Sequence, residues 1–381
     1  MMKKKRGVKG SDKEGIVFSI GSGNLENLLV CKQRVSLGDK HEITRKNLWG
    51  GSAVNISSRL LAASLPVIPI LAVGKDAAGS IICEALYKNA VTGGASARIL
   101  DYLKKEKCLI PGVETPTSTI LVHGRERSIF RPKLQTGKGF NQRFKNKIKK
   151  AMGEYVRRPI SVILGHIPTD GIGTRHPGEC TRFILNRLPK DVLVYGVFGS
   201  SQLALSFKPW SRQLDRIDIF QCNMEEAMRF FSQNNRKVSL RAIFGLLREK
   251  KMTAVLTMDR FGAIAVYKGR DYISVAWPLI PGDEVVDSTG AGDAFAAGTV
   301  SYLHNLNKGR DFTAENFEKA LHHGSIWAAA ACTTLGGCGE DPKKELSEFL
   351  KRHKNVAKIS TERKKLATAQ EFMNFIDLAY Q

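Results

Sequence analysis

Residues 285–298 read Val285-Val286-Asp287-Ser288-Thr289-Gly290-Ala291-Gly292-Asp293-Ala294-Phe295-Ala296-Ala297-Gly298, and they give the strongest local signal in the sequence. Its small residues form a turn, and a run of good helix formers follows to about Leu303. Gly290 and Gly292 let the backbone approach a ligand closely. The N–H groups of Gly290, Ala291 and Gly292 would then point outward at a helix N-terminus, where the helix dipole favours an anion. The stretch therefore predicts an anion-binding turn that opens a helix.

Asp293 lies in the first turn of the predicted helix, beside the anion-binding turn. A base in this place could remove the proton from a hydroxyl group that attacks a phosphorus atom. The same residues also fit a simple glycine-rich turn with an acidic helix cap. The turn alone leaves both interpretations open.

Short apolar runs alternate with amphipathic segments along most of the chain. The runs are rich in Val, Ile and Leu, as buried strands are, and the segments between them have helical spacing. This alternation predicts a parallel sheet covered by helices on both faces. The expected strands are Ile16–Ile20, Val67–Val73, Ile160–Leu164, Val192–Val197, Ile217–Phe220 and Ala254–Met258, and the expected helices include Asn55–Ala63, Ile81–Lys88, Glu225–Phe231 and Leu240–Lys250.

Two segments depart from this alternation. Thr117–His123 and Arg127–Phe130, on either side of Gly124, alternate apolar with polar residues, which is typical of an antiparallel hairpin. Leu28–Thr44 has a similar strand-and-turn character. We expect these segments to form a small sheet that stands off the main domain as a lid.

The composition is that of a globular protein with an unusual charge. Hydrophobic residues make up 43% and charged residues 25%, which excludes a disordered, collagen-like or disulfide-scaffold chain. Lys and Arg exceed Asp and Glu by 59 − 36 = 23, and the pI is about 9.8. Such an excess favours nucleic acid, a membrane surface or a phosphorylated small molecule as partner, or it is only a solvated basic surface. The basic stretch Arg143–Arg158 fits a solvated helix face.

Cysteine, histidine and hydropathy patterns define the expected environment. The seven cysteines form no CxxC pair, which favours free thiols in a reducing compartment, and the eight histidines lack metal-ligand spacing, so we expect no structural zinc. No apolar run approaches the length of a membrane span. The residues after Met1–Arg6 are polar, unlike those of a secretory signal. We therefore expect a cytoplasmic protein without a membrane partner.

Three further turns follow the same α/β order. Gly50–Asn55 opens a helix, Gly74–Gly79 follows a strand, and Asn223–Glu226 follows the strand at Ile217–Phe220. Together with Asp287–Gly298, this set resembles the ribokinase-like family of carbohydrate and nucleoside kinases, also called the PfkB family. Asp287–Gly298 is similar to the family's C-terminal signature, the two glycine turns to its N-terminal one, and Asn223–Glu226 to its NxxE motif.

The resemblance runs from about Ile16 to Leu350 and implies a fold and a division of the chain. The implied fold is a three-layer α/β/α sandwich with a central, mostly parallel sheet and a small β lid. Residues 15–352 would form the kinase domain, with the lid contributed by about 25–48 and 112–132. A basic N-terminal tail, 1–14, would precede it, and a C-terminal helical extension, 353–381, would follow.

The resemblance also implies an activity: transfer of the γ-phosphoryl group of ATP, with Mg²⁺, to a hydroxyl group of a sugar. Asp293 would be the general base, and Gly290, Ala291 and Gly292 would form the anion hole. Glu226 would act on Mg²⁺ through water, and Asp287 is a candidate ligand for a monovalent cation such as K⁺. The implied substrate-binding residues are Asn24, Glu26, Gly51 and Asn55, and the implied nucleotide-binding residues are Asn223, Thr257, Asp259, Gly262, Gly336 and Ser325.

Two residues depart from the family pattern. Glu26 stands where many sugar kinases have an Asp, so its longer side chain alters the hydroxyl contact. Thr257–Gly262 is similar to the family's TLGxxG segment, but Asp259 replaces the first glycine. A carboxylate beside a nucleotide is electrostatically unfavourable unless Arg260 or a metal ion offsets its charge.

Two alternatives to a sugar kinase stay open. One is a nucleoside kinase of the same family, although Asn24, Gly51 and Asn55 suit a polyol and no apolar slot for a base is identified. The other is a non-catalytic PfkB-like protein associated with nucleic acid, which the +23 charge and Asp259 favour and the presence of Asp293 disfavours. A homodimer that forms through the lid is a further expectation.

Overall fold

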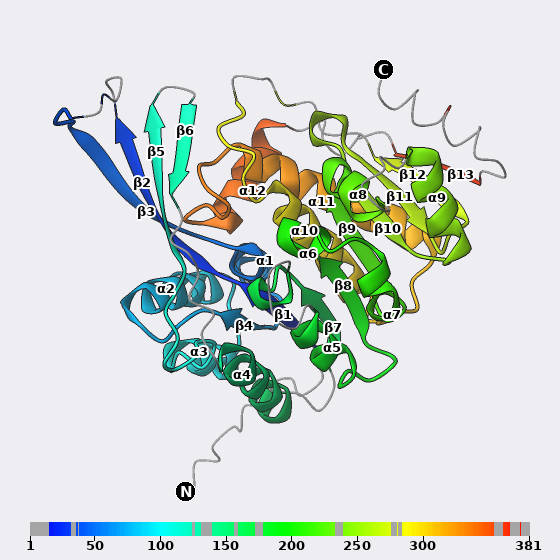
Figure 1. The fold of residues 1–381 in the computed structure, drawn as a ribbon, viewed down its shortest axis with the longest axis horizontal. Helices are drawn as coiled ribbons and strands as arrows, with labels where there is room; N and C mark the ends of the chain where they lie inside the picture. The colour runs from blue at the N-terminus through cyan, green and yellow to red at the C-terminus, as the bar shows by residue number, and fades with distance from the viewer. Residues whose placement is uncertain are drawn as a thin grey trace, which may run out of the picture.

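The computed structural model describes residues 15–31, 36, 38–123, 126–130, 139–155, 159–171, 178–232, 239–275, 280, 284–353, 361–365 and 374. Figure 1 shows a large twisted sheet wrapped by helices and a small sheet that rises beside it. The strands are β1 Ile16–Ser22, β2 Asn24–Cys31, β3 Ile43–Gly50, β4 Val67–Ala72, β5 Thr117–His123, β6 Glu126–Phe130, β7 Pro159–Leu164, β8 Leu193–Val197, β9 Ile219–Asn223, β10 Ala254–Thr257, β11 Ala263–Tyr267, β12 Asp271–Val275 and β13 Thr361–Lys365.

The helices lie between these strands in the alternating order that the sequence predicts. They are α1 Ser52–Ala62, α2 Ala77–Thr92, α3 Ala97–Lys104, α4 Phe140–Tyr155, α5 Glu179–Leu185, α6 Ser200–Leu203, α7 Ser211–Leu214, α8 Met224–Phe230, α9 Leu240–Glu249, α10 Ala291–Asn305, α11 Ala314–Cys332 and α12 Pro342–Arg352. Short 3₁₀ turns are η1 Pro168–Asp170, η2 Lys208–Trp210 and η3 Asp259–Phe261.

The large sheet has the strand order β13-β12-β11-β10-β9-β8-β7-β1-β4. Neighbouring strands from β4 to β10 are parallel, and β11, β12 and β13 add antiparallel strands at one edge. Strand β4 is buried at all six positions, and β1 at its five central ones. Such continuous apolar strands require cover on both faces, because a parallel sheet buries both.

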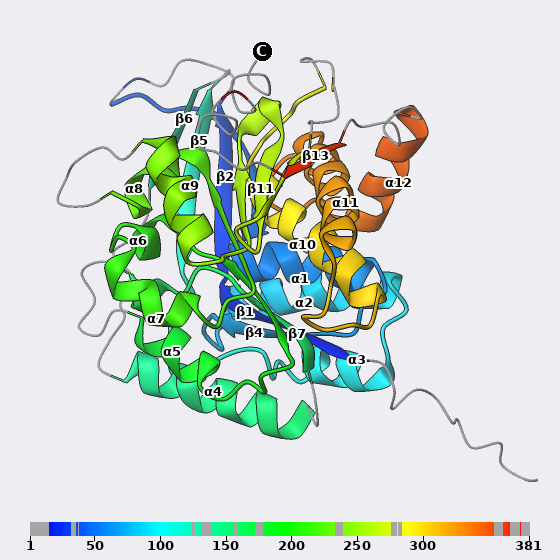
Figure 2. The same cartoon turned by 90° about the vertical axis from the view of Figure 1, so that its right-hand side faces the viewer.

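Helices supply that cover in two layers. Figure 2 shows α1, α10 and α11 on one side of the sheet and α4 to α9 on the other. The core is continuous through the sheet and includes the fully buried aromatic side chains of Phe18, Tyr195, Phe220, Phe295 and Phe317. The predicted fold class, a three-layer α/β/α sandwich with a mostly parallel sheet, is confirmed.

The small sheet has the order β3-β2-β5-β6, and β2 begins and β3 ends beside the large sheet. Asn24 in β2 pairs with Gly50 in β3, and Gly51 then caps the N-terminus of α1. The outer strand β3 is exposed over its first five residues. The base of this sheet is thereby tied to α1, whereas its far end extends away from the body.

The C-terminal region differs from the expected helical extension at Thr361–Lys365. This segment forms β13, which pairs antiparallel with β12 from Asp271↔Lys365 to Val275↔Thr361. Without it, β12 would leave a row of unpaired backbone groups at the sheet edge, and pairing satisfies them. That long-range gain outweighs the helical propensity of Glu362, Arg363 and the two lysines. The expected basic tail and all of the amphipathic run 369–378 except Asn374 lie outside the described residues.

None of the helices in the described part of the chain combines the length and the apolar character required to cross a bilayer.

Candidate active site

The N-terminus of α10 is held in place by close backbone packing. Gly290 has φ 76°, a left-handed conformation, and caps α10. A Cβ atom built on Gly290 would lie 2.6 Å from the Cα of Gly337, in the loop after α11. Both the positive φ and this approach require glycine. The predicted glycine turn before α10 is therefore packed, backbone against backbone, on the loop after α11.

Asp293 occupies the first turn of α10 and meets α1. The Nδ2 of Asn55 donates a hydrogen bond of 2.8 Å to the Oδ2 of Asp293. Burial raises the pKa of Asp293 to about 6, although the Asn55 hydrogen bond and the positive charge of Arg59 oppose that rise and Glu226 adds to it. A carboxylate with such a pKa is ionised near neutral pH and can still accept a proton.

A cavity of about 500 Å³ opens beside this turn, at the carboxyl ends of β8, β9 and β10. Ligands of parallel α/β sheets bind at this end of the strands. Eight of the predicted site residues line the cavity: Asn223, Glu226, Thr257, Asp259, Gly290, Ala291, Gly292 and Asp293.

Gly292 faces this cavity without close protein neighbours. Among the described residues, a Cβ atom built there would meet only the Nε2 of Gln221, at 3.6 Å, so this part of the fold would tolerate a larger residue. Gln221, which is buried in β9, donates from the same nitrogen to the carbonyl oxygen of Gly292 at 2.8 Å. Its Oε1 accepts from the hydroxyl of Tyr195 at 2.7 Å. This network fixes the turn from behind and leaves its front open to a ligand.

The predicted anion hole differs in one amide. The N–H of Ala291 donates to the carbonyl of Ser288 at 3.2 Å and is already used within the turn. Among the described residues, the N–H groups of Gly290 and Gly292 have no protein acceptor. Two of the three predicted donors, together with the positive end of the α10 dipole, are thus available to an anion.

Asn223 and Glu226 form a reciprocal cap at the start of α8. The Oδ1 of Asn223 accepts from the N–H of Glu226 at 2.7 Å, and the Oε2 of Glu226 accepts from the N–H of Asn223 at 3.1 Å. Ser200 donates to the Oε1 of Glu226 at 2.9 Å. This bonding accounts for the motif structurally and also fixes a carboxylate at the cavity wall.

The remaining predicted nucleotide residues are divided between the cavity and its surroundings. Asp259 lines the cavity together with Arg260, the cation that could offset its charge. Gly262 closes the turn after η3, where its carbonyl accepts from the N–H of Met258. Ser325 is 1% exposed within α11 and does not line the cavity.

Gly336 and Asp287 connect the loop after α11 to the segment before α10. The N–H of Gly336 donates to the Oδ2 of Asp287 at 3.1 Å, and that of Thr289 donates to Oδ1 at 2.9 Å. Both carboxylate oxygens therefore already hold backbone amides. A monovalent cation at Asp287 stays a prediction.

The predicted acceptor residues gather at the base of the small sheet. The Nδ2 of Asn24 donates to the Oε1 of Glu26 at 2.9 Å, and Gly51 lies against Gly23. Asn24, Glu26, Gly51 and Asn55 do not line the 500 Å³ cavity, and Asn55 adjoins it through its bond to Asp293. Asp293 thus lies between the cavity and this second group of polar residues.

Sequence reasoning assigned no role to several polar residues of the site. Gln221 is a polar residue within the apolar run of β9, a signal that could have identified it. Ser52 accepts from the N–H of His166 at 2.7 Å, and the His166 Nε2 lies 2.8 Å from the Oγ of Ser201. No spacing pattern connects these residues, and the fold brings Gln221, Ser52 and His166 to the same cavity.

The chain contains a pfkB-family domain. Residues 197–344 match the family model for pfkB family carbohydrate kinases, a span that runs from the end of β8 into α12. An uncharacterised sugar kinase from Dictyostelium discoideum is 23% identical over 182 residues, 42% of this chain and about half (49%) of the relative. An ATP-dependent 6-phosphofructokinase from Thermoanaerobacterium thermosaccharolyticum is 25% identical over 306 residues, 77% of this chain and 82% of the relative.

The fold similarity extends beyond the matched segment. The structure of Arabidopsis thaliana ribokinase in complex with ribose and ATP superimposes with a TM-score of 0.59 and 18% identity. The superposition covers 89% of this chain and 99% of that one. The chain thus shares its fold with this ribokinase over nearly its whole length.

A buried ion pair supports the domain behind Asp293. Arg59 lies one turn after Asn55 in α1, and its Nη1 donates to the Oε1 of Glu345 in α12 at 2.7 Å. Both side chains are 3% exposed. The Oε2 of Glu345 accepts from Thr334 at 3.0 Å, in the loop that holds Gly337. This pair therefore ties α1, α12 and the loop after α11 together.

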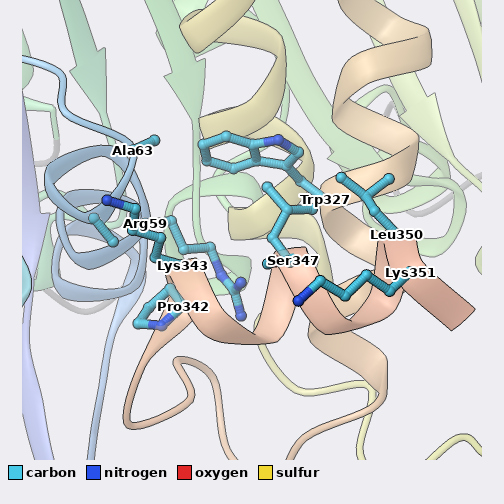
Figure 3. A pocket seen from close by; sticks show the side chains of 10 residues that line it. Arg59, Ala63, Trp327, Pro342, Lys343, Ser347, Leu350 and Lys351 are labelled. Carbon is cyan, nitrogen blue, oxygen red and sulfur yellow. The ribbon is translucent and has the colours of Figure 1, made fainter. Parts of the chain in front are cut away.

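A cavity of about 480 Å³ lies beside this ion pair. Figure 3 shows Trp327 of α11 above α12, with the side chains of Leu350 and Lys351 at the far end. Arg59 lines the cavity, and its Nε and Nη2 have no hydrogen-bond partner among the described residues. Glu345 is thus the single carboxylate that offsets this charge within bonding distance in the described part of the chain.

We expect Glu345→Gln to destabilise the protein by about 3 to 5 kcal/mol, because it removes the carboxylate that is hydrogen-bonded to the buried Arg59 guanidinium. Urea unfolding measures the loss. Glu348→Gln is the matched control, since Glu348 is exposed on the same helix and its contact with Lys344 is long, at 3.8 Å. Its expected cost is below about 0.5 kcal/mol. Equal effects of the two substitutions would contradict the structural role of the pair.

Gly290→Ala should lower the stability of the domain, because the new Cβ meets the backbone of Gly337 and the left-handed φ disfavours alanine. A loss of about 2 kcal/mol or more is expected. Gly245→Ala in α9 is the control, since a Cβ there meets nothing within 4 Å and alanine favours a helix by about 1 kcal/mol. Thermal unfolding should move in opposite directions for the two variants, and a shift in the same direction would refute the assigned packing.

Asp293→Asn should stabilise the protein at pH 8 and leave it unchanged near pH 4. The folded-state pKa of about 6 lies above the unfolded value of about 3.9, so the free energy of unfolding falls as the pH rises through this interval, and the full penalty of the buried carboxylate is present above pH 6. The expected gain at pH 8 is on the order of 2 kcal/mol. Urea unfolding of both proteins at the two pH values measures it, and equal stability at pH 8 would contradict the raised pKa.

Proposed function

We propose that the protein transfers the γ-phosphoryl group of ATP to a hydroxyl group of a sugar. The observation that carries this proposal is the place of Asp293. Its carboxylate lies in the first turn of α10, within hydrogen-bond distance of Asn55 and at the edge of a cavity where the N–H groups of Gly290 and Gly292 have no acceptor among the described residues. A base, an anion site and a polar acceptor site thus meet at one carboxylate.

The proposed chemistry needs little covalent participation by the protein. Asp293 takes the proton from the acceptor hydroxyl while that oxygen bonds to the γ-phosphorus and the bond to the β-phosphate oxygen breaks, which releases ADP. The N–H groups of Gly290 and Gly292 and the dipole of α10 stabilise the negative charge of the transferred group. Ala291 contributes through the turn itself, because its own N–H is bonded to Ser288.

The charges of the cavity support a divalent cation as part of the reaction. Glu226, Asp259 and Asp293 line the cavity, against the single guanidinium of Arg260 among its described lining residues. In the described part of the chain, no three acidic, histidine or cysteine side chains gather as a complete metal site. Mg²⁺ characteristically binds through one or two carboxylates, water and substrate phosphates. The residues fit that mode, with Glu226 as the carboxylate, and the ion would offset phosphate charge.

For the acceptor, we propose the polar group Asn24, Glu26, Gly51 and Asn55 at the base of the small sheet. Glu26 is longer than the aspartate typical of relatives, and its bond to Asn24 directs it along β2. The small sheet would act as the lid that excludes water from the transferred group. The relatives named above as a sugar kinase, a phosphofructokinase and a ribokinase are consistent with a sugar.

An assay of ATP consumption with a panel of sugars and nucleosides tests the proposed function. We expect turnover with a sugar, and Asp293→Asn should reduce kcat by about 10² to 10⁴-fold without loss of folding. In the wild type, kcat/KM should fall about tenfold per pH unit below pH 6, because the base becomes protonated.

Gly292→Ala provides the matched comparison within the same turn. Its Cβ has room in the protein but would enter the cavity, so we expect normal stability and a raised KM for ATP. A folded Asp293→Asn protein with the wild-type rate would refute the assignment of the base. If the protein phosphorylates nucleosides and no sugar, the proposed acceptor is a nucleoside instead of a sugar.

A further inference from the structure

A second hollow, of about 690 Å³, lies among α5, η2 and α7. Five cationic residues line it: Arg182, Lys190, Lys208, Arg212 and Arg216. No Asp or Glu is among its described lining residues. We refer to this feature as the basic hollow.

The basic hollow lies at the opposite end of the sheet from the candidate active site. Lys190 comes just before β8 and Arg216 just before β9, whereas Ser200 and Asn223 of the first cavity lie at the other ends of these strands. Strands β8 and β9 are parallel, so their amino ends share one edge. The two sites are therefore separate, and a ligand of one does not touch the other.

Four of the five cations are available to a ligand. Arg182, Lys190, Lys208 and Arg212 are exposed, and in the described part of the chain none of their side chains has an ion pair or a hydrogen bond. This distinguishes them from cations such as Lys145 and Lys319, which pair with neighbouring glutamates at 2.7 Å.

Arg216 is instead fixed at the wall of the basic hollow. Its guanidinium donates to the carbonyls of Pro189 at 2.5 Å and Val192 at 3.2 Å and lies 3.5 Å from Asp218. Asp218 is shared with Arg310, at 2.7 Å, so the carboxylate that is ion-paired with Arg216 is divided between two guanidinium groups, and Asp191 adds a further negative charge nearby. The arginine is thus held in position at the wall of the hollow.

We propose that the basic hollow binds a compact oligophosphate, a chain of two or more phosphates that is either inorganic or part of a nucleotide. Five like charges around one hollow repel each other, and a multivalent anion relieves that repulsion more than a single phosphate does. The volume falls within the usual range of small-ligand sites. The cations converge on one hollow rather than following a line, which suits a compact ligand better than a nucleic-acid backbone.

Isothermal titration of the full chain with inorganic tripolyphosphate tests this proposal. Arg182→Gln with Arg212→Gln should weaken binding about tenfold, since two exposed charge contacts are lost. The control is Arg241→Gln with Lys308→Gln, which removes two exposed cations that lie outside the hollow and have no side-chain hydrogen bond or ion pair among the described residues, and it should leave the affinity within about twofold. Gly292→Ala, altered only in the first cavity, should retain the binding of the hollow. Added salt should weaken it.

The arms of the titration distinguish the sources of the oligophosphate. If Arg182→Gln with Arg212→Gln weakens the binding of ATP and of tripolyphosphate equally, the phosphate chain is the group that the hollow recognises. If the double variant weakens ATP binding more, the site is assigned to nucleotides. The proposal is overturned if the hollow variant binds tripolyphosphate as the control does. It is also overturned if the wild type binds duplex DNA but not tripolyphosphate, and if Arg182→Gln with Arg212→Gln abolishes the DNA binding. These outcomes do not depend on turnover, so they stand apart from the test of the kinase activity.

Discussion

The hydrogen bond between Asn55 and Asp293 is the contact on which the candidate site depends. It joins residues 238 positions apart and closes the corner between α1 and α10. Three other features maintain that corner: the glycine contact between Gly290 and Gly337, the ion pair of Arg59 with Glu345, and the bond from Thr334 to Glu345. Each brings a different segment to the same place, so the helix pair, the loop after α11 and α12 form one unit.

This arrangement also explains why a buried carboxylate is compatible with the fold. Desolvation raises the pKa of Asp293, but the Asn55 amide and the Arg59 charge limit that rise. A carboxylate in the same place without these partners would be protonated over more of the physiological range. The residues that stabilise the corner are therefore also the residues that keep Asp293 ionised near neutral pH.

The sequence predicted most of this arrangement where local chemistry determines it. The apolar strands, the glycine turn before α10 and the capping pair Asn223–Glu226 all follow from short-range spacing. It could not predict β13, because the gain from pairing with β12 arises only when the sheet edge exists. The same is true of Glu345 and Gln221, whose roles come from partners 286 and 71 positions away. The use of the Ala291 amide by Ser288 likewise depends on the turn geometry rather than on the residue types.

The excess of positive charge has an uneven distribution that the composition does not reveal. At the carboxyl ends of β8 and β9, the first cavity has three carboxylates and one arginine among its described lining residues. Toward the amino ends of the same strands, the basic hollow has five cations and no acid. Among the described residues, positive charge is therefore not concentrated at the site where a nucleoside triphosphate would react. Exposed like charges destabilise the compact state by repulsion. The cations gathered in a hollow remote from that site are therefore more consistent with a second anionic ligand than with phosphoryl transfer.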